Sequence, residues 1–491
     1  MHSEPRAASI APSISTSEGR DIAIEPTPVI PPVSHHVHVR ERSYKLLEDA
    51  RIRARDAKKY SSHGTRQTMI EQCQKRANVT PYPEQLDLAE CMLLGLDATS
   101  IAGTGWGKTL TFVLPLFVPQ SKGKMVIIVS PLNALEDDQA ERFKKMGLKA
   151  VALNGDTNTP ELLKDIEKGT YDVILVGPKL LTGERSTVRD LLSKPHFNRR
   201  VLGFVIDEAH CICQWGGSFR QEYSQLAVVR ALLSTVTSIL VTSATMTPVV
   251  LENTWKSVLI DPEKSFVLNL GNDRRNIEWR VESMTAGKAD LGCLQFLVPE
   301  NVEELISLPK TMVFFDDIFQ SQKARRWLLE RLPKRFHERV KCYNARLGDQ
   351  TKKFVMKGFR KGTIDILLTT EAAGMGCDIP DIVRVVQYMT PESLGVWIQR
   401  AGRAGRSPGI RAVAILLVET SVFAEKGKKD RKEGDTITYV KTLEPGLRKY
   451  VDAPEDQCRR DIVDEYFDNP PGRRGMLVVC ASISCAHTKH L

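Results

Sequence analysis

The stretch Ala102-Gly103-Thr104-Gly105-Trp106-Gly107-Lys108-Thr109 follows a predicted strand at residues 98–101 and opens a predicted helix. A glycine-rich turn of this kind brings backbone N–H groups to phosphate at a helix N-terminus. Lys108 would neutralise the β and γ oxygens of a nucleotide, and Thr109 would offer its hydroxyl to Mg²⁺. Because Ala102 replaces the first glycine of the usual pattern, an ordinary glycine-rich turn is the alternative. Further nucleotide contacts are expected from Gly103, Thr104, Gly105 and Gly107.

An acidic box, Asp207-Glu208-Ala209-His210, stands at the end of the apolar run 201–206. Such a run is typical of a buried parallel strand, which delivers the residues that follow it to the edge of the sheet. Asp207 would hold the water shell of Mg²⁺, and Glu208 would orient or deprotonate the attacking water. The pair of motifs therefore predicts a nucleotide hydrolysis site.

A third motif, Gln399-Arg400-Ala401-Gly402-Arg403-Ala404-Gly405-Arg406, lies far beyond the acidic box. An arginine brought to a γ-phosphate stabilises the charge of the transition state. We expect Arg403 and Arg406 to act in this way and Gln399 to contact the nucleotide. The alternative is a solvated basic helix end. If the arginines do reach the nucleotide, a second domain must close over the first.

Apolar runs typical of strands alternate with amphipathic helical patterns along the chain, which predicts an α/β fold. Each group of strands is expected to form a parallel sheet with helices on both faces, giving two tandem lobes. The expected divisions are a disordered tail (1–40), a helical N-terminal extension (41–79), an ATP-binding lobe (80–262), a second lobe (263–420), and a charged linker with a small C-terminal segment (421–491). The predicted strands are 98–101, 125–129, 173–176, 204–206 and 238–241, then 311–315, 364–369, 383–387 and 413–417.

The composition is typical of a large globular protein with a net positive charge. It has 491 residues, 42% hydrophobic residues and a net charge of +9, which suits a polyanionic partner. Ten cysteines without regular spacing and no long apolar run indicate a reduced intracellular protein that does not enter membranes. The histidine tract 35–38 could bind metal, although an unstructured tract is favoured.

Other segments have weaker signals. Gln85 could read the adenine edge with its amide, although a surface glutamine is the alternative. Ser243 and Thr245, after a predicted strand, could hydrogen-bond the acidic box and relay the nucleotide state. In the segment after that box, Trp215 and Phe219 could stack on unpaired bases while Arg220 contacts phosphate. The alternative for Trp215 and Phe219 is a buried aromatic cluster.

The order of these motifs resembles that of superfamily-two nucleic-acid helicases. The segment 207–223, which includes Gln214 and the aromatics, is similar to the aromatic-rich loop of RecQ DNA helicases. The resemblance implies two RecA-like P-loop lobes and ATP- and Mg²⁺-dependent unwinding of DNA with 3′-to-5′ polarity. Single-stranded, tailed or forked DNA, a role in recombination or repair, and a nuclear location follow as expectations. Gly217, Ser218 and Gln221 depart from the usual loop, which leaves an RNA-dependent ATPase or a non-catalytic binding module as alternatives.

The C-terminal segment resembles the start of the RecQ zinc-binding subdomain at Cys458-Arg459-Arg460. Cys480 and Cys485 have four residues between them rather than two, and His487 and His490 are imperfect substitutes for a missing ligand. A zinc site needs four tetrahedral ligands. We therefore expect zinc to bind weakly or not at all.

Overall fold

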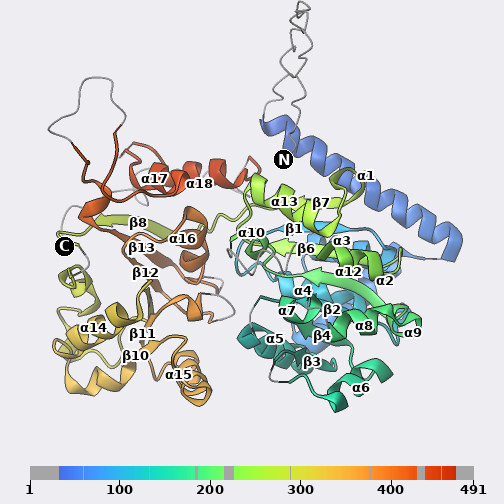
Figure 1. The fold of residues 1–491 in the computed structure, drawn as a ribbon, viewed down its shortest axis with the longest axis horizontal. Coiled ribbons are helices and arrows are strands. Elements are labelled where there is room, and N and C mark those ends of the chain that lie inside the picture. Colours follow the sequence, from blue (N-terminus) through green and yellow to red (C-terminus); the bar gives the residue numbers. More distant parts are fainter. Residues whose placement is uncertain are drawn as a thin grey trace, which may run out of the picture.

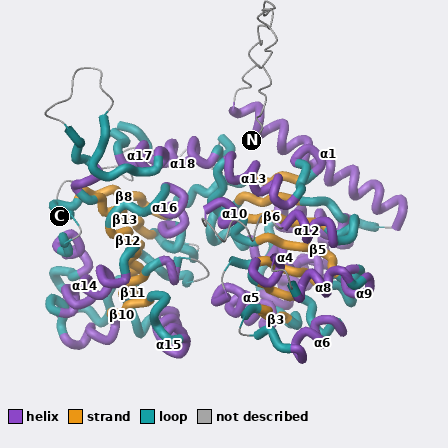
Figure 2. Tube along the Cα trace, viewed as in Figure 1, coloured by secondary structure: helices purple, strands orange, loops and turns teal. Residues whose placement is uncertain are grey.

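The computed structural model describes residues 32–58, 60–131, 133–155, 157–182, 186–214, 226–287, 289–374, 379–407, 409–427, 437–454 and 456–471. Two α/β lobes lie side by side, as Figure 1 shows, and Figure 2 shows the strands as the centre of each lobe with helices around them. Both sheets are entirely parallel. The predicted fold class, two RecA-like lobes, is confirmed.

The first lobe is built on a seven-stranded sheet in the order β3-β4-β2-β5-β6-β1-β7. Successive residues of β2 belong to two different hydrophobic cores, one on each face of the sheet. Ile127 packs in one core and Val126 in the other. Burial on both faces explains why the strands are apolar throughout rather than alternating. The strands are β1 (Ala98–Ile101), β2 (Met125–Val129), β3 (Ala150–Leu153), β4 (Val173–Val176), β5 (Val201–Ile206), β6 (Ser238–Ser243) and β7 (Phe266–Asn269). The helices are α3 (Pro83–Leu94), α4 (Lys108–Val113), α5 (Asn133–Lys145), α6 (Pro160–Lys168), α7 (Pro178–Thr182), α8 (Thr187–Ser193), α9 (Pro195–Asn198), α10 (Cys211–Gln214), α12 (Leu226–Leu232) and α13 (Pro248–Val258).

The second lobe has a six-stranded sheet in the order β10-β11-β9-β12-β13-β8. Met312 and Val313, neighbours on β9, again face two separate cores. The strands are β8 (Ile277–Ser283), β9 (Thr311–Phe314), β10 (Val340–Tyr343), β11 (Ile366–Thr369), β12 (Arg384–Tyr388) and β13 (Ala412–Val418). The helices are α14 (Ile318–Leu329), α15 (Asp349–Lys361), α16 (Leu394–Ala401), α17 (Pro445–Val451) and α18 (Arg459–Phe467).

Two boundaries differ from those expected. Helix α1 (Pro32–Lys58) begins inside the tail predicted to be disordered, because it packs along β7 and α3 and gains its stability from that tertiary contact. Strand β7 pairs with β1, with Phe266 beside Ala98, so the first lobe continues past the predicted boundary at residue 262. The extension is completed by α2 (Ser62–Ala77).

The described part of the C-terminal segment is packed against the second lobe rather than forming only a linker. Tyr450 of α17 and Phe467 of α18 are buried in the same core as Trp397 of α16. Among the helices that the structure describes, none is long and apolar enough to cross a membrane.

Candidate active site

The P-loop, residues 102–109, joins β1 to α4 in a conformation that depends on glycine. Gly105 and Gly107 have φ angles of +85° and +88°, a region that residues with a Cβ rarely enter. Lys108 is the first residue of α4, and its Nζ donates to the carbonyl of Ala102 at 2.8 Å. The loop therefore combines backbone N–H groups with a half-buried ammonium, as the binding of a polyphosphate requires.

Gln85, at the start of α3, supports this loop from behind. Its Oε1 accepts from the N–H of Tyr82 at 2.9 Å, and its Nε2 donates to the carbonyls of Trp106 and Gly107, both at 3.1 Å. The two amide hydrogens and the amide oxygen are thus engaged. Gln85 therefore supports the loop in this structure, and its contact with adenine stays a prediction.

The two carboxylates of the acidic box follow β5. Asp207 accepts from Nε2 of Gln139 at 2.9 Å and from the N–H of Glu208 at 3.0 Å. Burial, together with the neighbouring Glu208 carboxylate, raises the pKa of Asp207. Glu208 has a φ angle of +48°, an uncommon backbone conformation for a residue with a side chain. This conformation is typical of functional sites that hold a residue in place.

His210 connects the acidic box to the end of β6. Its Nδ1 lies 2.9 Å from Oγ of Ser243 and 3.4 Å from the carboxylate of Glu208. Burial lowers the pKa of His210, and the Glu208 carboxylate opposes that shift. Ser243 Oγ also accepts from the N–H of Thr245, and the Ser243 carbonyl accepts from the N–H of Ala102. Ser243 therefore touches both the acidic box and the P-loop, as the predicted relay needs.

The arginine motif of the second lobe reaches the P-loop across the space between the lobes. Thr104 Oγ1 donates to the carbonyl of Gly402 at 2.9 Å, and a Cβ on Gly402 would lie 2.4 Å from that hydroxyl. Gln399 is buried, and its Nε2 has no hydrogen-bond partner among the described residues. An unsatisfied buried donor at this position fits an absent anionic ligand.

The three arginines of the motif differ in their partners. Arg400 is neutralised by Glu371, at 2.6 Å, and Asp316, at 2.7 Å, and is part of the second lobe's own structure. Arg403 is buried and donates to the carbonyl of Gly374. Burial by itself would raise the pKa of Glu208, but His210, Lys108, Arg403 and Arg406 outweigh burial and lower it. Charges from both lobes therefore meet at Glu208.

Arg274, on the connection between β7 and β8, joins the same site and was missed by sequence reasoning. Its guanidinium donates to the carbonyl of Thr104 at 2.7 Å and to the carbonyl of Gly405 at 2.5 Å. Burial and the nearby Arg406 lower its pKa to about 10. The only signal in the sequence is the polar run 273–276 between two strands, which is ordinary for a loop.

The site has more cations than carboxylates. Lys108, Arg403 and Arg406 act on Glu208, and Arg274 lies next to Arg406. Burial and the two arginines of the motif lower the pKa of Lys108. An excess of desolvated positive charge fits a nucleoside triphosphate. Thr109, in the first turn of α4, and Asp207 supply the oxygen atoms that Mg²⁺ prefers.

Several of the residues predicted to bind DNA or zinc lie outside the part of the chain that the structure describes. Gln214 is the last residue of α10, and Trp215, Phe219 and Arg220 lie outside the described residues. Cys458 precedes α18 as its N-cap, whereas Cys480 and Cys485 lie beyond the described part of the chain. Within the described residues, no group of three or more His, Cys, Asp or Glu side chains could hold a metal ion.

Comparison with known proteins identifies two domains. Residues 82–254 match the DEAD/DEAH box helicase model and residues 298–408 match the helicase conserved C-terminal domain. The chain is similar to "Probable ATP-dependent DNA helicase RecS" of Bacillus subtilis, with 29% identity over 387 residues that cover 78% of this chain and 73% of that protein. It is also similar to "RecQ-like DNA helicase blm-1" of Caenorhabditis elegans, with 25% identity over 76% of this chain and 37% of the relative.

Among solved structures, Mss116p bound to single-stranded RNA and AMP-PNP is similar in fold, with a TM-score of 0.59 at 19% identity over 74% of each chain. The chain spans about three quarters of RecS but well under half of blm-1. The two matched domains coincide with the two lobes, and the P-loop and arginine motif lie one in each. The chain therefore joins a DEAD/DEAH box helicase domain to a helicase conserved C-terminal domain, and it is similar to DNA helicases that include a RecQ-like one.

Proposed function

We propose that this protein is a DNA helicase or translocase that moves 3′ to 5′ and couples ATP hydrolysis to the unwinding of tailed or forked duplexes. The observation that carries the proposal is the contact of both lobes at one charge cluster: Glu208 and Lys108 belong to the first lobe, and Arg403 and Arg406 to the second. Hydrolysis at such a site requires the lobes to close, which converts a chemical step into relative movement.

Each residue of the cluster has a role in this scheme. The N–H groups of the P-loop and the Lys108 ammonium bind phosphate oxygens. Glu208, whose pKa is lowered, is charged and accepts the proton of the attacking water. Arg403 and Arg406 stabilise the negative charge that develops on the transferred phosphoryl group. Mg²⁺, held through Thr109 and Asp207, would neutralise phosphate charge when bound.

Coupling to DNA is proposed to run through the segment that follows the acidic box. Helix α10 begins directly after His210, and the predicted base-stacking residues Trp215 and Phe219 come next in the chain. A bound DNA strand that moved this segment would also move His210. Through His210, the movement would reach Ser243 and Glu208. Recombination or repair is the setting that we propose for this activity, and a nuclear location is the expectation that follows from it.

The decisive experiment is unwinding of 3′-tailed, 5′-tailed and forked DNA duplexes with ATP and Mg²⁺. We expect the 3′-tailed and forked substrates to be unwound and the 5′-tailed one to remain paired. Unwinding from the 5′ tail alone would reject the polarity. ATP hydrolysis stimulated by single-stranded RNA and not by DNA would instead support the RNA-dependent alternative.

A further inference from the structure

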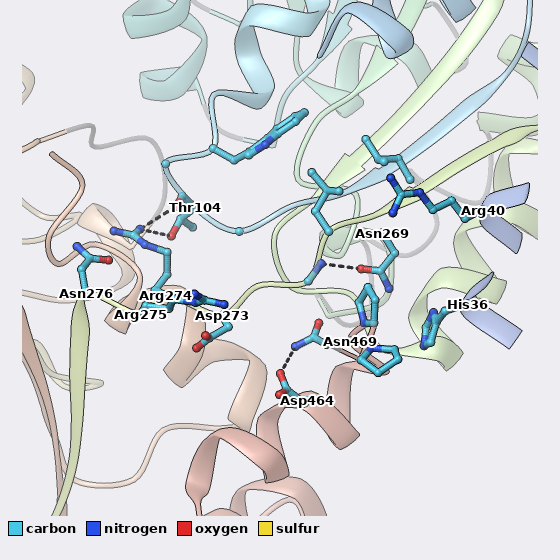
Figure 3. Close-up of a pocket in the computed structure, with 18 of the residues that line it drawn as sticks. His36, Arg40, Thr104, Asn269, Asp273, Arg274, Arg275, Asn276, Asp464 and Asn469 are labelled. Carbon is cyan, nitrogen blue, oxygen red and sulfur yellow. Dashed lines mark hydrogen bonds between the residues drawn. The ribbon is translucent and has the colours of Figure 1, made fainter. Parts of the chain in front are cut away.

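The two edges of the first sheet carry different surfaces. At the carboxyl edge, where the strands end, a cavity of about 650 Å³ opens beside the P-loop, and Figure 3 shows Thr104 and Arg274 in its wall. The nucleotide site lies at this edge. The opposite edge, where the strands begin, is about 20 Å away, because the six residues of β5 separate Arg200 from Asp207.

Basic side chains gather at this opposite edge, in the turns that lead into four neighbouring strands, β3, β4, β2 and β5. Figure 1 shows α6 and α9, which end at two of these turns, on the side of the first lobe that is turned away from the second lobe. We call this surface the basic strip. Its cations are Lys122, Lys124, Lys149, Lys168, Arg199 and Arg200.

Backbone hydrogen bonds hold the turns of the basic strip side by side. The N–H of Met125 donates to the carbonyl of Arg200 at 2.8 Å, and the N–H of Asp172 donates to the carbonyl of Lys149 at 2.8 Å. The N–H of Val126 donates to the carbonyl of Asp172 at 2.9 Å and joins the two pairs. Since neighbouring strands lie about 4.8 Å apart, the four turns span about 14 Å.

Neutral groups position two of these cations. Lys124 Nζ donates to the carbonyl of Arg199 at 2.7 Å, and Arg200 Nε donates to the carbonyl of Gly123 at 3.1 Å. The guanidinium of Arg200 also packs against Gly169, where a Cβ would collide with it. The carbonyls fix the geometry of the basic strip and leave its positive charge in place.

Nearby acids do not balance that charge. Asp172 lies within the basic strip, and its carboxylate accepts from the backbone N–H of Lys149 at 2.9 Å. Glu167, next to Lys168, is paired with Lys194 at 2.7 Å instead. Within the described part of the chain, no ion pair involves a cation of the basic strip. The surface therefore has a net positive charge that can attract a polyanion.

The spacing and the side chains favour the backbone of duplex DNA. One strand of B-form DNA carries a phosphate for about every 3.4 Å of its axis, so about four phosphates match a span of about 14 Å. Sites for single strands add aromatic side chains on which bases stack. The exposed aromatic side chains that the structure describes all lie outside the basic strip; they are Tyr82, Phe319, Phe354 and Phe423.

We propose that the basic strip is a second DNA-binding surface, which holds the phosphate backbone of duplex DNA on the edge of the first lobe opposite the nucleotide site. It is separate from the segment after the acidic box, through which coupling is proposed. It therefore adds affinity for duplex DNA and takes no part in hydrolysis. The inference depends neither on unwinding nor on its polarity.

The first test reverses two charges of the basic strip. Lys122→Glu combined with Arg199→Glu is compared with Lys45→Glu combined with Arg53→Glu, which makes the same change of charge at exposed positions of α1. Fluorescence anisotropy measures the binding of a blunt duplex of about 20 base pairs to the full chain, at several salt concentrations between about 50 and 200 mM.

We expect the basic-strip variant to bind the duplex at least about tenfold more weakly. The slope of log affinity against log salt should fall by about two, since each phosphate contact contributes about 0.9. The α1 variant should stay within about twofold of the wild-type affinity. An unchanged slope, or an equal loss in both variants, would overturn the proposal.

The second test uses the wild-type protein and so does not depend on the folding of a variant. Lysine acetylation is followed by mass spectrometry with and without the blunt duplex. Lys122, Lys149 and Lys168 should be protected by the duplex, whereas Lys45 should react at the same rate in both samples. Equal reactivity of the basic-strip lysines with and without DNA would reject the proposal.

Further probes separate other partners and the proposed function. A basic-strip variant that loses binding to phosphatidylserine vesicles or to polyglutamate, but binds the duplex normally, would assign the surface to a membrane or to an acidic protein and overturn the inference. ATP hydrolysis with a saturating single-stranded oligonucleotide should be unchanged in this variant, and its loss would contradict a separate surface. Wild-type protein that binds the duplex through the basic strip but hydrolyses no ATP would remove the proposed function alone.

Discussion

Two charge clusters, one on α3 and one at the nucleotide site between the lobes, hold their cations in different ways. In the cluster on α3, the carboxylates of Asp87 and Glu90 meet the guanidinium groups of Arg51 and Arg66, with separations down to 2.5 Å. Tyr60 adds a hydrogen bond to Glu90 at 2.8 Å. Two acids and two bases balance each other, and the N-terminal extension is thereby fixed to the lobe.

The nucleotide cluster holds its cations differently. Lys108 donates to the carbonyls of Ala102 and Gly103, and Arg274 donates to the carbonyls of Thr104 and Gly405. Neutral acceptors position a cation without cancelling its charge. A buried charge with an ionised partner stabilises the fold, whereas a buried charge held by neutral carbonyls stays available to a ligand. Substitutions in the α3 cluster should therefore change the free energy of unfolding, and substitutions in the nucleotide cluster should change turnover.

The largest effect is expected at the nucleotide. Lys108→Ala removes phosphate charge compensation, and Glu208→Gln removes the base, so each should lower DNA-stimulated turnover roughly a hundred- to a thousandfold. Thermal denaturation should show little loss of stability, because other charged groups of the cluster remain beside each substituted position. Near-normal turnover in either variant would remove the ATPase assignment.

The α3 cluster should respond with stability instead. Arg66→Ala leaves the buried Glu90 and Asp87 carboxylates short of a cation, at a cost of about 3 kcal/mol in the free energy of unfolding. Urea titration measures that cost, and turnover per folded molecule should remain normal. Arg55→Ala on the exposed face of α1 is the control and should unfold like the wild-type protein. Equal stabilities of the two variants would show that the cluster is not a structural anchor.

A buried carboxylate outside both clusters, Glu136, extends the comparison through the pH dependence of stability. Burial raises the pKa of Glu136 from 4.5 to about 7, with only a long hydrogen bond from Asn154, at 3.5 Å, opposing it. The folded state therefore keeps a proton that the unfolded chain releases above pH 4.5, so stability falls as pH rises from about 4.5 to about 7. Glu136→Gln should remove this decline and be more stable than the wild-type protein by roughly 2 kcal/mol at pH 8. Parallel pH profiles of the two proteins in chemical denaturation would contradict this.

The smallest of these effects is expected at Arg274. Arg274→Ala removes a link between the P-loop and the arginine motif, and turnover should fall about tenfold while ATP affinity stays within about twofold. Arg411→Ala removes the same charge from an exposed residue that does not line the cavity beside the P-loop, and it should leave turnover unchanged. A loss of ATP affinity without a loss of turnover would assign Arg274 to binding rather than to lobe positioning.

The parallel strands and the two lobes could be predicted because each strand such as Met125–Val129 is continuously apolar. The four strands at the edges of the two sheets, β3, β7, β8 and β10, were not predicted. In β8, Glu278, Trp279 and Arg280 break the apolar pattern. The support that Gln85 gives the P-loop could not be predicted, because it depends on the carbonyls of Trp106 and Gly107 pointing toward α3. The contribution of Arg274 is likewise a property of the folded chain, since it depends on two loops that are remote in sequence.

The central claim is that the second lobe completes the nucleotide site, and Arg406→Ala tests it most directly. ATP hydrolysis is measured with saturating single-stranded DNA, and ATP affinity is measured on the same protein. We predict an affinity within about threefold of the wild-type value and turnover reduced by about a hundredfold or more, because the arginine acts mainly on transition-state charge. Wild-type turnover by a folded Arg406→Ala protein would contradict the account.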